Sequence, residues 1–149
     1  MHRKEFIKNC GYACLGSTAL IGLLQGCNST KILQGSINGS DLLIPLKEFE
    51  IKSTGGVKFK NSLLIQNDIL QYPVCVFRLK ENEYTALWMQ CTHQGTELQV
   101  FGDKLQCPAH GSEFDNRGNM QNGPAISGLR TFPVIVENDM LKISLKKQQ

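Results

Sequence analysis

Two short segments each hold a cysteine and a histidine, and together they contain two of the three histidines of this 149-residue chain; they constrain its fold more than any other feature. The first is Cys91-Thr92-His93. The second is Cys107-Pro108-Ala109-His110-Gly111-Ser112, and thirteen residues separate His93 from Cys107. The one remaining histidine is His2, in the first residues of the chain. Paired Cys and His side chains in separate segments predict a fold that brings two loops to one point.

This ligand set indicates a two-iron centre. Two cysteines and two histidines, one of each per segment, meet the requirement of a [2Fe–2S] cluster in which two thiolates hold one iron and two imidazoles hold the other. Tetrahedral zinc, in a structural binding module, is the alternative. Zinc pairs usually have two to four residues between the ligands, whereas only Thr92 separates Cys91 from His93. The pattern therefore favours one [2Fe–2S] cluster and electron transfer.

The beginning of the chain is typical of an exported lipoprotein. Residues 1–26 have a basic start and a short apolar stretch, and they end in Leu24-Gln25-Gly26 before Cys27. This order resembles a bacterial lipobox, whose cysteine receives the lipid after cleavage. An uncleaved membrane helix is the alternative, but residues 10–26 fall short of the ~20 residues that span hydrocarbon. We therefore expect an export signal over 1–26 and lipidation at Cys27.

The export route stays open between two kinds of leader. Arg3-Lys4-Glu5-Phe6-Ile7-Lys8 resembles the twin-arginine motif with Lys4 in place of the second arginine, and a generic basic leader is the alternative. Residues 27–40 are then expected to form the lipidated cysteine and a flexible Gly/Ser/Asn-rich tether, with a single domain over 41–149. This organisation predicts a protein of the bacterial cell envelope, on the periplasmic face or outer surface of a membrane.

The body of the chain reads as all-β. Short β-type runs alternate with turn residues, and no apolar helical repeat exceeds two turns. Expected strands cover 42–51, 62–66, 74–79, 84–89, 97–101, 104–106, 112–115, 131–137 and 140–145. Polar breaks at 81–83, 102–103 and 138–139 predict hairpin connections. An antiparallel β-sandwich or barrel follows, with the Cys/His segments in loops at one tip.

The two Cys/His segments resemble the cluster-binding boxes of Rieske iron–sulfur proteins. Cys91-Thr92-His93-Gln94-Gly95 matches the first box and residues 107–112 match the second, while Asn122-Gly123-Pro124-Ala125 is similar to the proline loop of that family. The resemblance implies a Rieske-like fold with a small cluster-binding subdomain. It also implies that Cys91 and Cys107 hold the inner iron, and that His93 and His110 hold the outer one.

The chain departs from the respiratory members of this family at two places. Those members pair two further cysteines between the loops, where this chain has Thr96 and Ala109, so the resemblance implies a form without that disulfide. They also have a tyrosine at the position of Phe114. Ser112 is retained and can tune the cluster by a hydrogen bond to a bridging sulfide. Gly111 and Pro124 are expected to shape its surroundings. Together these residues predict an intermediate potential within roughly −150 to +300 mV.

Composition narrows the function further. From Cys27 onward the chain carries 13 basic and 12 acidic side chains, so no nucleic-acid partner is expected. An oxygenase iron site would need two more histidines and a carboxylate, and no further histidine lies in the body. We therefore expect an electron carrier, not an enzyme by itself, that serves a redox partner protein or a quinol-oxidising complex. The alternative is a small subunit of a separate catalytic chain, as in molybdenum oxidoreductases.

Overall fold

Two β-sheets packed face to face form the base of the molecule. The computed structural model describes residues 31–146. One sheet has the order β1 (Ile32–Gln34), β6 (Ser62–Gln66), β7 (Val74–Lys80), β8 (Glu83–Trp88) and β13 (Thr131–Phe132). The other has the order β14 (Val134–Glu137), β15 (Met140–Ser144), β3 (Asp41–Pro45) and β2 (Ser36–Asn38). All pairings are antiparallel except that of β1 with β6. The predicted all-β class is confirmed.

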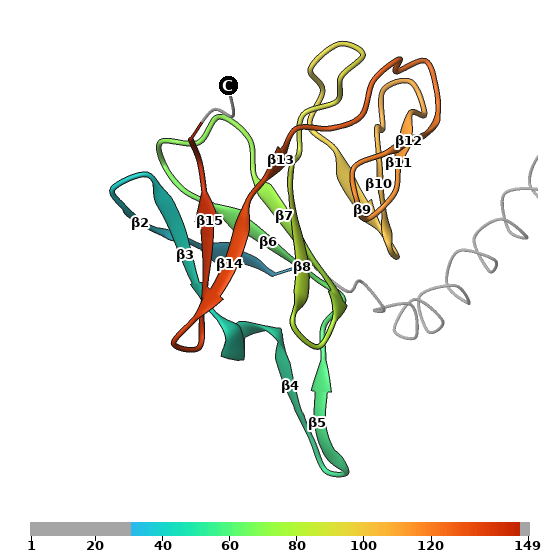
Figure 1. The fold of residues 1–149 in the computed structure, drawn as a ribbon. Helices are drawn as coiled ribbons and strands as arrows, with labels where there is room; N and C mark the ends of the chain where they lie inside the picture. Colours follow the sequence, from blue (N-terminus) through green and yellow to red (C-terminus); the bar gives the residue numbers. More distant parts are fainter. Residues whose placement is uncertain (1–30, 147–149) are drawn as a thin grey trace, which may run out of the picture.

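A smaller sheet lies beside this sandwich and forms a subdomain. It has the order β12 (Met120–Asn122), β11 (Glu113–Phe114), β10 (Lys104–Gln106) and β9 (Gln99–Phe101), and Figure 1 shows it next to β7 and β8. A separate hairpin of β4 (Glu50–Ser53) and β5 (Gly56–Phe59) projects from the opposite end. Within residues 31–146, no helix is long and apolar enough to cross a membrane.

The central strand β7 shows why the subdomain packs where it does. Four successive residues from Val74 to Phe77 are buried, although neighbouring side chains on a strand point to opposite faces. Val74 and Val76 belong to the core between the two large sheets. Cys75 and Phe77 belong to a second core, shared with the subdomain. A strand covered on both faces needs an unbroken apolar run, and 74–77 supplies it.

The tether expected over 27–40 is wrong for residues 32–38. These residues form β1 and β2, which pair with β6 and β3. Leu33 is buried, and a side chain at Gly35 would overlap Leu42 and Ile65. Strands of three residues carry too little periodicity to be recognised. The partner of β1 also lies far along the chain, whereas β2 forms a hairpin with the neighbouring β3. The folded domain therefore begins before residue 41, while the export signal and Cys27 lie outside the described residues.

Prolines divide two of the expected strands. The expected strand 42–51 ends at Pro45 and continues as a 3₁₀ turn, η2 (Leu46–Phe49), before β4. The expected strand 131–137 divides at Pro133 into β13 and β14, which belong to different sheets. Proline cannot donate to a ladder, and so it ends the pairing at both places.

The structure confirms two of the expected tight turns directly. Gly102-Asp103 joins β9 to β10, and Asn138-Asp139 joins β14 to β15 with positive φ angles of 51° and 59°. Two-residue hairpin loops favour such angles. The turn expected over 81–83 comprises only Glu81-Asn82, because Glu83 already pairs with Lys80.

Candidate metal centre

The two Cys/His segments fold into loops with the same hydrogen-bond pattern. In the first, the N–H of Gly95 donates to the carbonyl of Cys91 at 2.8 Å, and the N–H of Cys91 donates to Thr96. In the second, Gly111 donates to Cys107 at 3.0 Å, and Cys107 donates to Ser112. The two glycines have φ angles of 76° and 77°, which other residues adopt only with strain. Both cysteines therefore begin equivalent turns, closed by a glycine four residues later.

The thiols of the two loops meet inside the subdomain. Cys91 and Cys107 are free cysteines with 2% and 1% of their surface exposed. Burial works to raise the pKa of the Cys107 thiol, but donors from its own loop and from Cys91 hold that pKa below its ordinary value. The loop donors are the backbone N–H groups of His110 and Ala109. This environment favours the thiolate, the form that binds metal.

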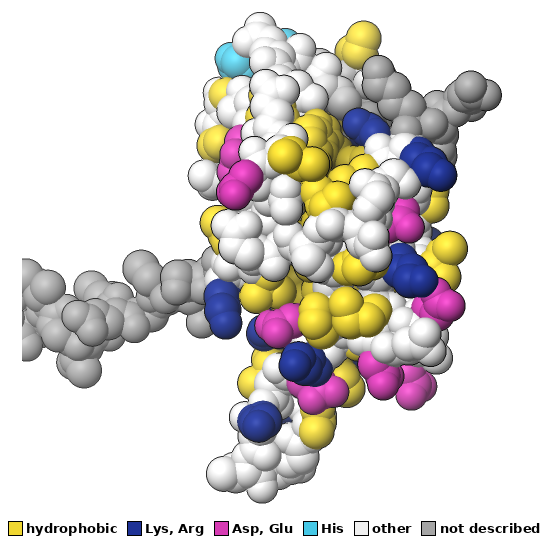
Figure 2. All heavy atoms as spheres, turned by 90° about the vertical axis from the view of Figure 1, so that its left-hand side faces the viewer, with side chains coloured by type: hydrophobic (Ala, Val, Ile, Leu, Met, Phe, Trp, Pro, Cys, Tyr) yellow, Lys and Arg dark blue, Asp and Glu magenta, His cyan; other side chains and the backbone are white. Residues whose placement is uncertain are grey.

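The two imidazoles meet at the outer end of the same loops. The ring centroids of His93 and His110 lie 5.0 Å apart, with the ring planes nearly perpendicular. His110 is exposed and His93 is half-buried. Histidine side chains reach the surface at the top of the molecule, far from the projecting hairpin (Figure 2). The structure thus forms one thiol pair inside and one imidazole pair outside.

One buried atom shows that this arrangement fits a metal centre. Nδ1 of His93 is buried and has no hydrogen-bond partner. An unsatisfied buried polar atom costs about 1–3 kcal/mol, which a metal bond would remove. Among residues 31–146, no three Cys, His, Asp or Glu side chains gather as they would around one ion. Separate thiol and imidazole pairs are what two irons require, each held by two protein ligands.

A third loop covers the thiol side of this tip. The backbone N–H of Ala125 donates to Oγ of Ser112 at 3.1 Å, and Oγ1 of Thr92 donates to the carbonyl of Ser127 at 2.8 Å. Ala125 is buried, whereas Pro124 is exposed. The segment that resembles the proline loop therefore contacts both Cys/His loops. Gly118 lies outside this loop and packs against Leu87 in a separate turn.

Two of the proposed tuning residues differ in their surroundings. Ser112 is fully buried, and its oxygen already accepts the Ala125 N–H, so the hydroxyl proton is left to donate elsewhere. Phe114 is also fully buried, but it packs in the core that contains Cys75 and Leu87. The structure therefore gives Phe114 a clear packing role.

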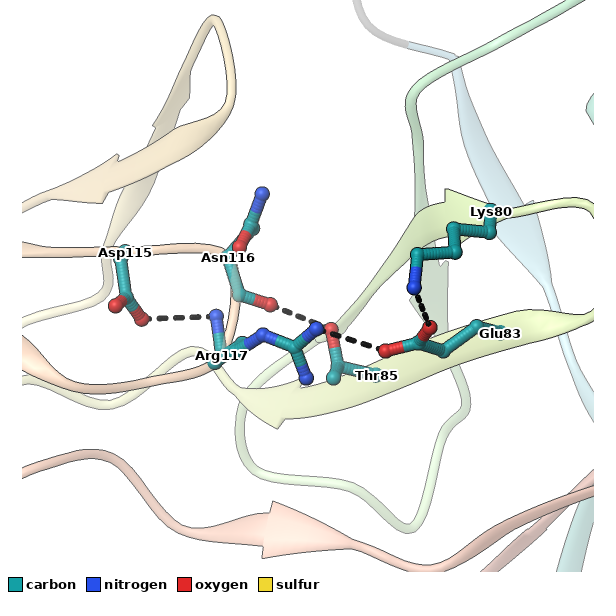
Figure 3. A network of polar contacts seen from close by, with 6 residues as sticks. All are labelled: Lys80, Glu83, Thr85, Asp115, Asn116 and Arg117. Carbon is teal, nitrogen blue, oxygen red and sulfur yellow. Dashed lines mark hydrogen bonds and ion pairs between the residues drawn. The ribbon is translucent and has the colours of Figure 1, made fainter.

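A polar network fixes the subdomain to the base of the fold (Figure 3). Oδ1 of Asp115 accepts backbone N–H bonds from Arg117 and Asn119 at 2.9 and 2.8 Å. The Arg117 guanidinium donates to Glu83 on β8 at 2.7 Å, and Oγ1 of Thr85 donates to the Asn116 carbonyl. This network has no local sequence signal, because Arg117 and Glu83 lie 34 residues apart.

The network also perturbs two carboxyl groups. Burial works to raise the pKa of Asp115, but the donors on Asn119 and Arg117 hold that pKa below its ordinary value. Hydrogen bonds from Arg117 and then Lys80 lower the pKa of Glu83. Both groups are therefore held as carboxylates, on the turn and on the strand that the turn contacts.

A polar groove of about 600 Å³ opens beside His93. Its walls include the first loop, Ser127 and Arg130. The hydroxyl of Tyr72 donates to the carbonyl of Gly95 at 2.7 Å and so supports the first loop from the base of the fold. Neither Tyr72 nor Arg130 carries a sequence signal for this position, because each reaches the site from a distant segment.

Comparisons with known proteins agree with this arrangement. The family model of the Rieske [2Fe-2S] domain matches residues 48–133. The cytochrome b6-f complex iron-sulfur subunit of Synechococcus sp. (strain CC9605) is 39% identical over 56 residues, which are 36% of this chain and 32% of that subunit. The oxygenase component of dicamba O-demethylase from Stenotrophomonas maltophilia is 35% identical over 83 residues, covering 49% of this chain and 24% of that protein. The chain thus spans about a third or less of these curated relatives.

Solved structures show the same fold. The plasma membrane Rieske protein of Synechocystis PCC 6803 has a TM-score of 0.50 and 29% identity, covering 56% of this chain and 86% of that chain. The ferredoxin of carbazole 1,9a-dioxygenase from Nocardioides aromaticivorans IC177 has a TM-score of 0.51 and 22% identity, covering 70% and 95%. This chain belongs to the Rieske [2Fe-2S] domain family, whose members carry one [2Fe–2S] cluster per domain and transfer electrons through it.

Proposed function

We propose that Cys91 and Cys107 hold the inner iron of the cluster, that His93 and His110 hold the outer one, and that the protein transfers single electrons at a membrane surface. The observation that carries this assignment is the unpartnered, buried Nδ1 of His93 beside a second imidazole and above a pair of buried thiols. When bound, the cluster takes up and releases one electron at a time.

The protein residues prepare the site for that electron. Buried thiols keep the inner side away from water, and the loop from Gly123 to Ser127 covers it. Ser112 has a proton to donate toward a bridging sulfide, which favours the reduced state. The exposed edge of His110 offers the shortest route to a partner. Electrons therefore enter and leave at the imidazole end.

Spectroscopy of ligand variants tests the assignment. The purified protein is expected to show the visible absorption and, after dithionite, the EPR signal of a His-ligated [2Fe–2S] cluster. Cys91→Ala and Cys107→Ala should each abolish both signals. Cys75→Ala is the matched control, since Cys75 is fully buried in the same core and burial raises the pKa of its thiol. Loss of the cluster in the Cys75 variant alone would contradict the ligand set.

The membrane location rests on the Cys27 lipobox. A plasma membrane protein among the similar structures and b6-f subunits among the relatives support a place in the cell envelope, as one component of a respiratory or other exported oxidoreductase. Mass spectrometry of the processed protein should find an acylated N-terminal cysteine at position 27. Cys27→Ala should abolish incorporation of labelled fatty acid into the protein, and a variant that still takes up the label would contradict lipidation at Cys27.

The redox partner can be identified by copurification. In mild detergent, the protein is expected to copurify with a membrane oxidoreductase that reduces or oxidises its cluster. Co-isolation with a quinol-oxidising complex would assign it to that complex, whereas co-isolation with a molybdenum-containing chain would make it the small subunit of that enzyme. A protein that purifies alone and exchanges electrons only with soluble carriers would contradict both assignments.

A further inference from the structure

The β4–β5 hairpin is exposed along its whole length. Every residue of both strands is exposed, and the hairpin projects from the body at the end away from the cluster loops (Figure 1). An isolated two-stranded hairpin is marginally stable in water. This one nevertheless carries apolar side chains into solvent, with exposed fractions of 43% at Ile51 and 59% at Val57. These exposed aliphatic side chains therefore indicate that the hairpin also contacts a surface less polar than water.

Both faces of the hairpin mix apolar and charged side chains. Ile51 pairs with Lys58 on one face. The other face has Val57 opposite Lys52 and Phe59 opposite Glu50. A hairpin that lay flat on a protein would place its apolar residues on one side. Here each face combines a lysine with at least one apolar side chain, and the second face also carries Phe59 and Glu50. Figure 2 shows lysine and apolar side chains together on this projection. Such a mixture suits a layer that surrounds both faces at once, such as lipid headgroups over the edge of the acyl chains.

Charge distinguishes this end from the rest of the molecule. Residues 47–60 contain four lysines and two glutamates, a formal charge of +2. The other residues from 31 to 146 contain eight basic and ten acidic side chains, a formal charge of −2. An anionic surface therefore attracts the hairpin end and repels the remainder of the domain.

The entry of the chain places this end near the proposed anchor. Strand β1 runs parallel to β6 with Ile32 beside Leu64, so the chain enters next to the start of β6. Only Lys60 and Asn61 lie between β5 and β6. Four residue steps from Cys27 to Lys31 reach at most about 14 Å, and the hairpin itself is roughly 15 Å long. The lipid and the hairpin can therefore reach the same membrane surface.

We propose that the β4–β5 hairpin is a second membrane contact, which inserts its lysine and aliphatic side chains among anionic headgroups and holds the cluster loops away from the anchoring bilayer. The proposal rests on the lipid anchor at Cys27 for its orientation. The hairpin contact itself does not depend on that anchor. It requires the side chains of Ile51, Lys52, Val57 and Lys58, and it needs no lipid on the protein.

The test uses the full chain with Cys27→Ser, loaded with its cluster, so that no thiol remains at position 27 for acylation. Its partition onto phosphatidylcholine vesicles is compared with its partition onto vesicles that also contain phosphatidylglycerol. We expect binding to the anionic vesicles to fall about fivefold for each lysine removed, and so roughly 25-fold in Lys52→Gln/Lys58→Gln. The leader is present in every variant and cancels from this comparison.

Matched variants separate charge, apolar contact and folding. Lys142→Gln/Lys146→Gln removes the same charge on and just beyond β15 and should leave binding within about twofold of the parent. Ile51→Ser/Val57→Ser should weaken binding while keeping its dependence on phosphatidylglycerol. Each variant should fold normally, because the four side chains lie outside both cores. An unchanged cluster spectrum checks this.

Equal loss in the two lysine pairs, or no preference for anionic vesicles, would overturn the hairpin contact. So would a hairpin variant that binds vesicles normally but loses a copurifying protein, since the hairpin would then contact that protein. The mass of the processed wild-type protein tests the lipid at Cys27 separately. An absent lipid with intact hairpin binding would refute the anchor and leave the hairpin contact standing.

Discussion

Ser112 is the residue that we expect to adjust the cluster most directly. Its oxygen accepts the Ala125 N–H, so its own proton is free to stabilise the more negative, reduced state. Ser112→Ala should lower the midpoint potential. The shift is about 60 mV if the lost hydrogen bond is about 1.4 kcal/mol stronger in the reduced state than in the oxidised state. Protein-film voltammetry measures the shift.

Ser127 provides the control for that measurement. It contacts Thr92 through its backbone carbonyl, which a side-chain change leaves in place. Ser127→Ala should therefore keep the parent potential. A wild-type midpoint near the upper limit of about +300 mV would contradict the intermediate value expected from one retained serine and the phenylalanine at position 114.

Asp115 makes the stability of the turn between β11 and β12 depend on pH. Its folded-state pKa is depressed, so its contribution is present above the unfolded value of about 3.9 and is lost as the pH falls through the lower folded value. Asp115→Ala should reduce the free energy of unfolding by about 1–2 kcal/mol at neutral pH. Denaturation at several pH values should show this difference shrinking in acid, while Asp103→Ala in the exposed β9–β10 turn shows little effect at any pH.

At the scale of elements, the close approach of the β11–β12 turn to β8 requires a glycine. Gly118 has a φ of 84°, and a Cβ there would lie 2.9 Å from Cδ2 of Leu87. Gly102 has a φ of 64° with open space around it. Gly118→Ala should therefore lower the free energy of unfolding by about 1–3 kcal/mol more than Gly102→Ala does. Both add backbone strain, but only Gly118→Ala also adds overpacking. Equal losses in urea denaturation would show that Leu87 moves aside freely.

Whether an element was predictable depended on where its pairing partner lies. The two-residue turns at 102–103 and 138–139 join neighbouring strands, so local residues identified them. Strand β1 pairs instead with β6, about 30 residues further on. Strand β2 pairs with the neighbouring β3 across Gly39-Ser40, and its three residues are too few to show a period of two. A polar segment of this length has no local pattern that distinguishes such pairing from a tether.

At the scale of the whole molecule, the two cores stabilise different parts of the fold. One core fills the space between the large sheets, and the other surrounds both thiols beneath the subdomain. The strands of that subdomain have only two or three residues. Because metal bonds contribute folding energy, removing the cluster should expose amides of residues 90–129 to hydrogen exchange and leave β3, β7 and β15 protected. A uniform loss of protection would contradict this division.

The sequence by itself determined the chemistry of the tip. Two Cys/His segments with a glycine after each, and a following Gly-Pro loop, are local patterns, and the structure brings all three loops together. Only the tertiary structure decided how that tip is held and oriented. The Glu83–Arg117 contact, the exchange of sheets at Pro133 and the position of the β4–β5 hairpin arise from pairings between distant segments. Such pairings depend on the shape of the assembled sheets, which no local run of residues specifies.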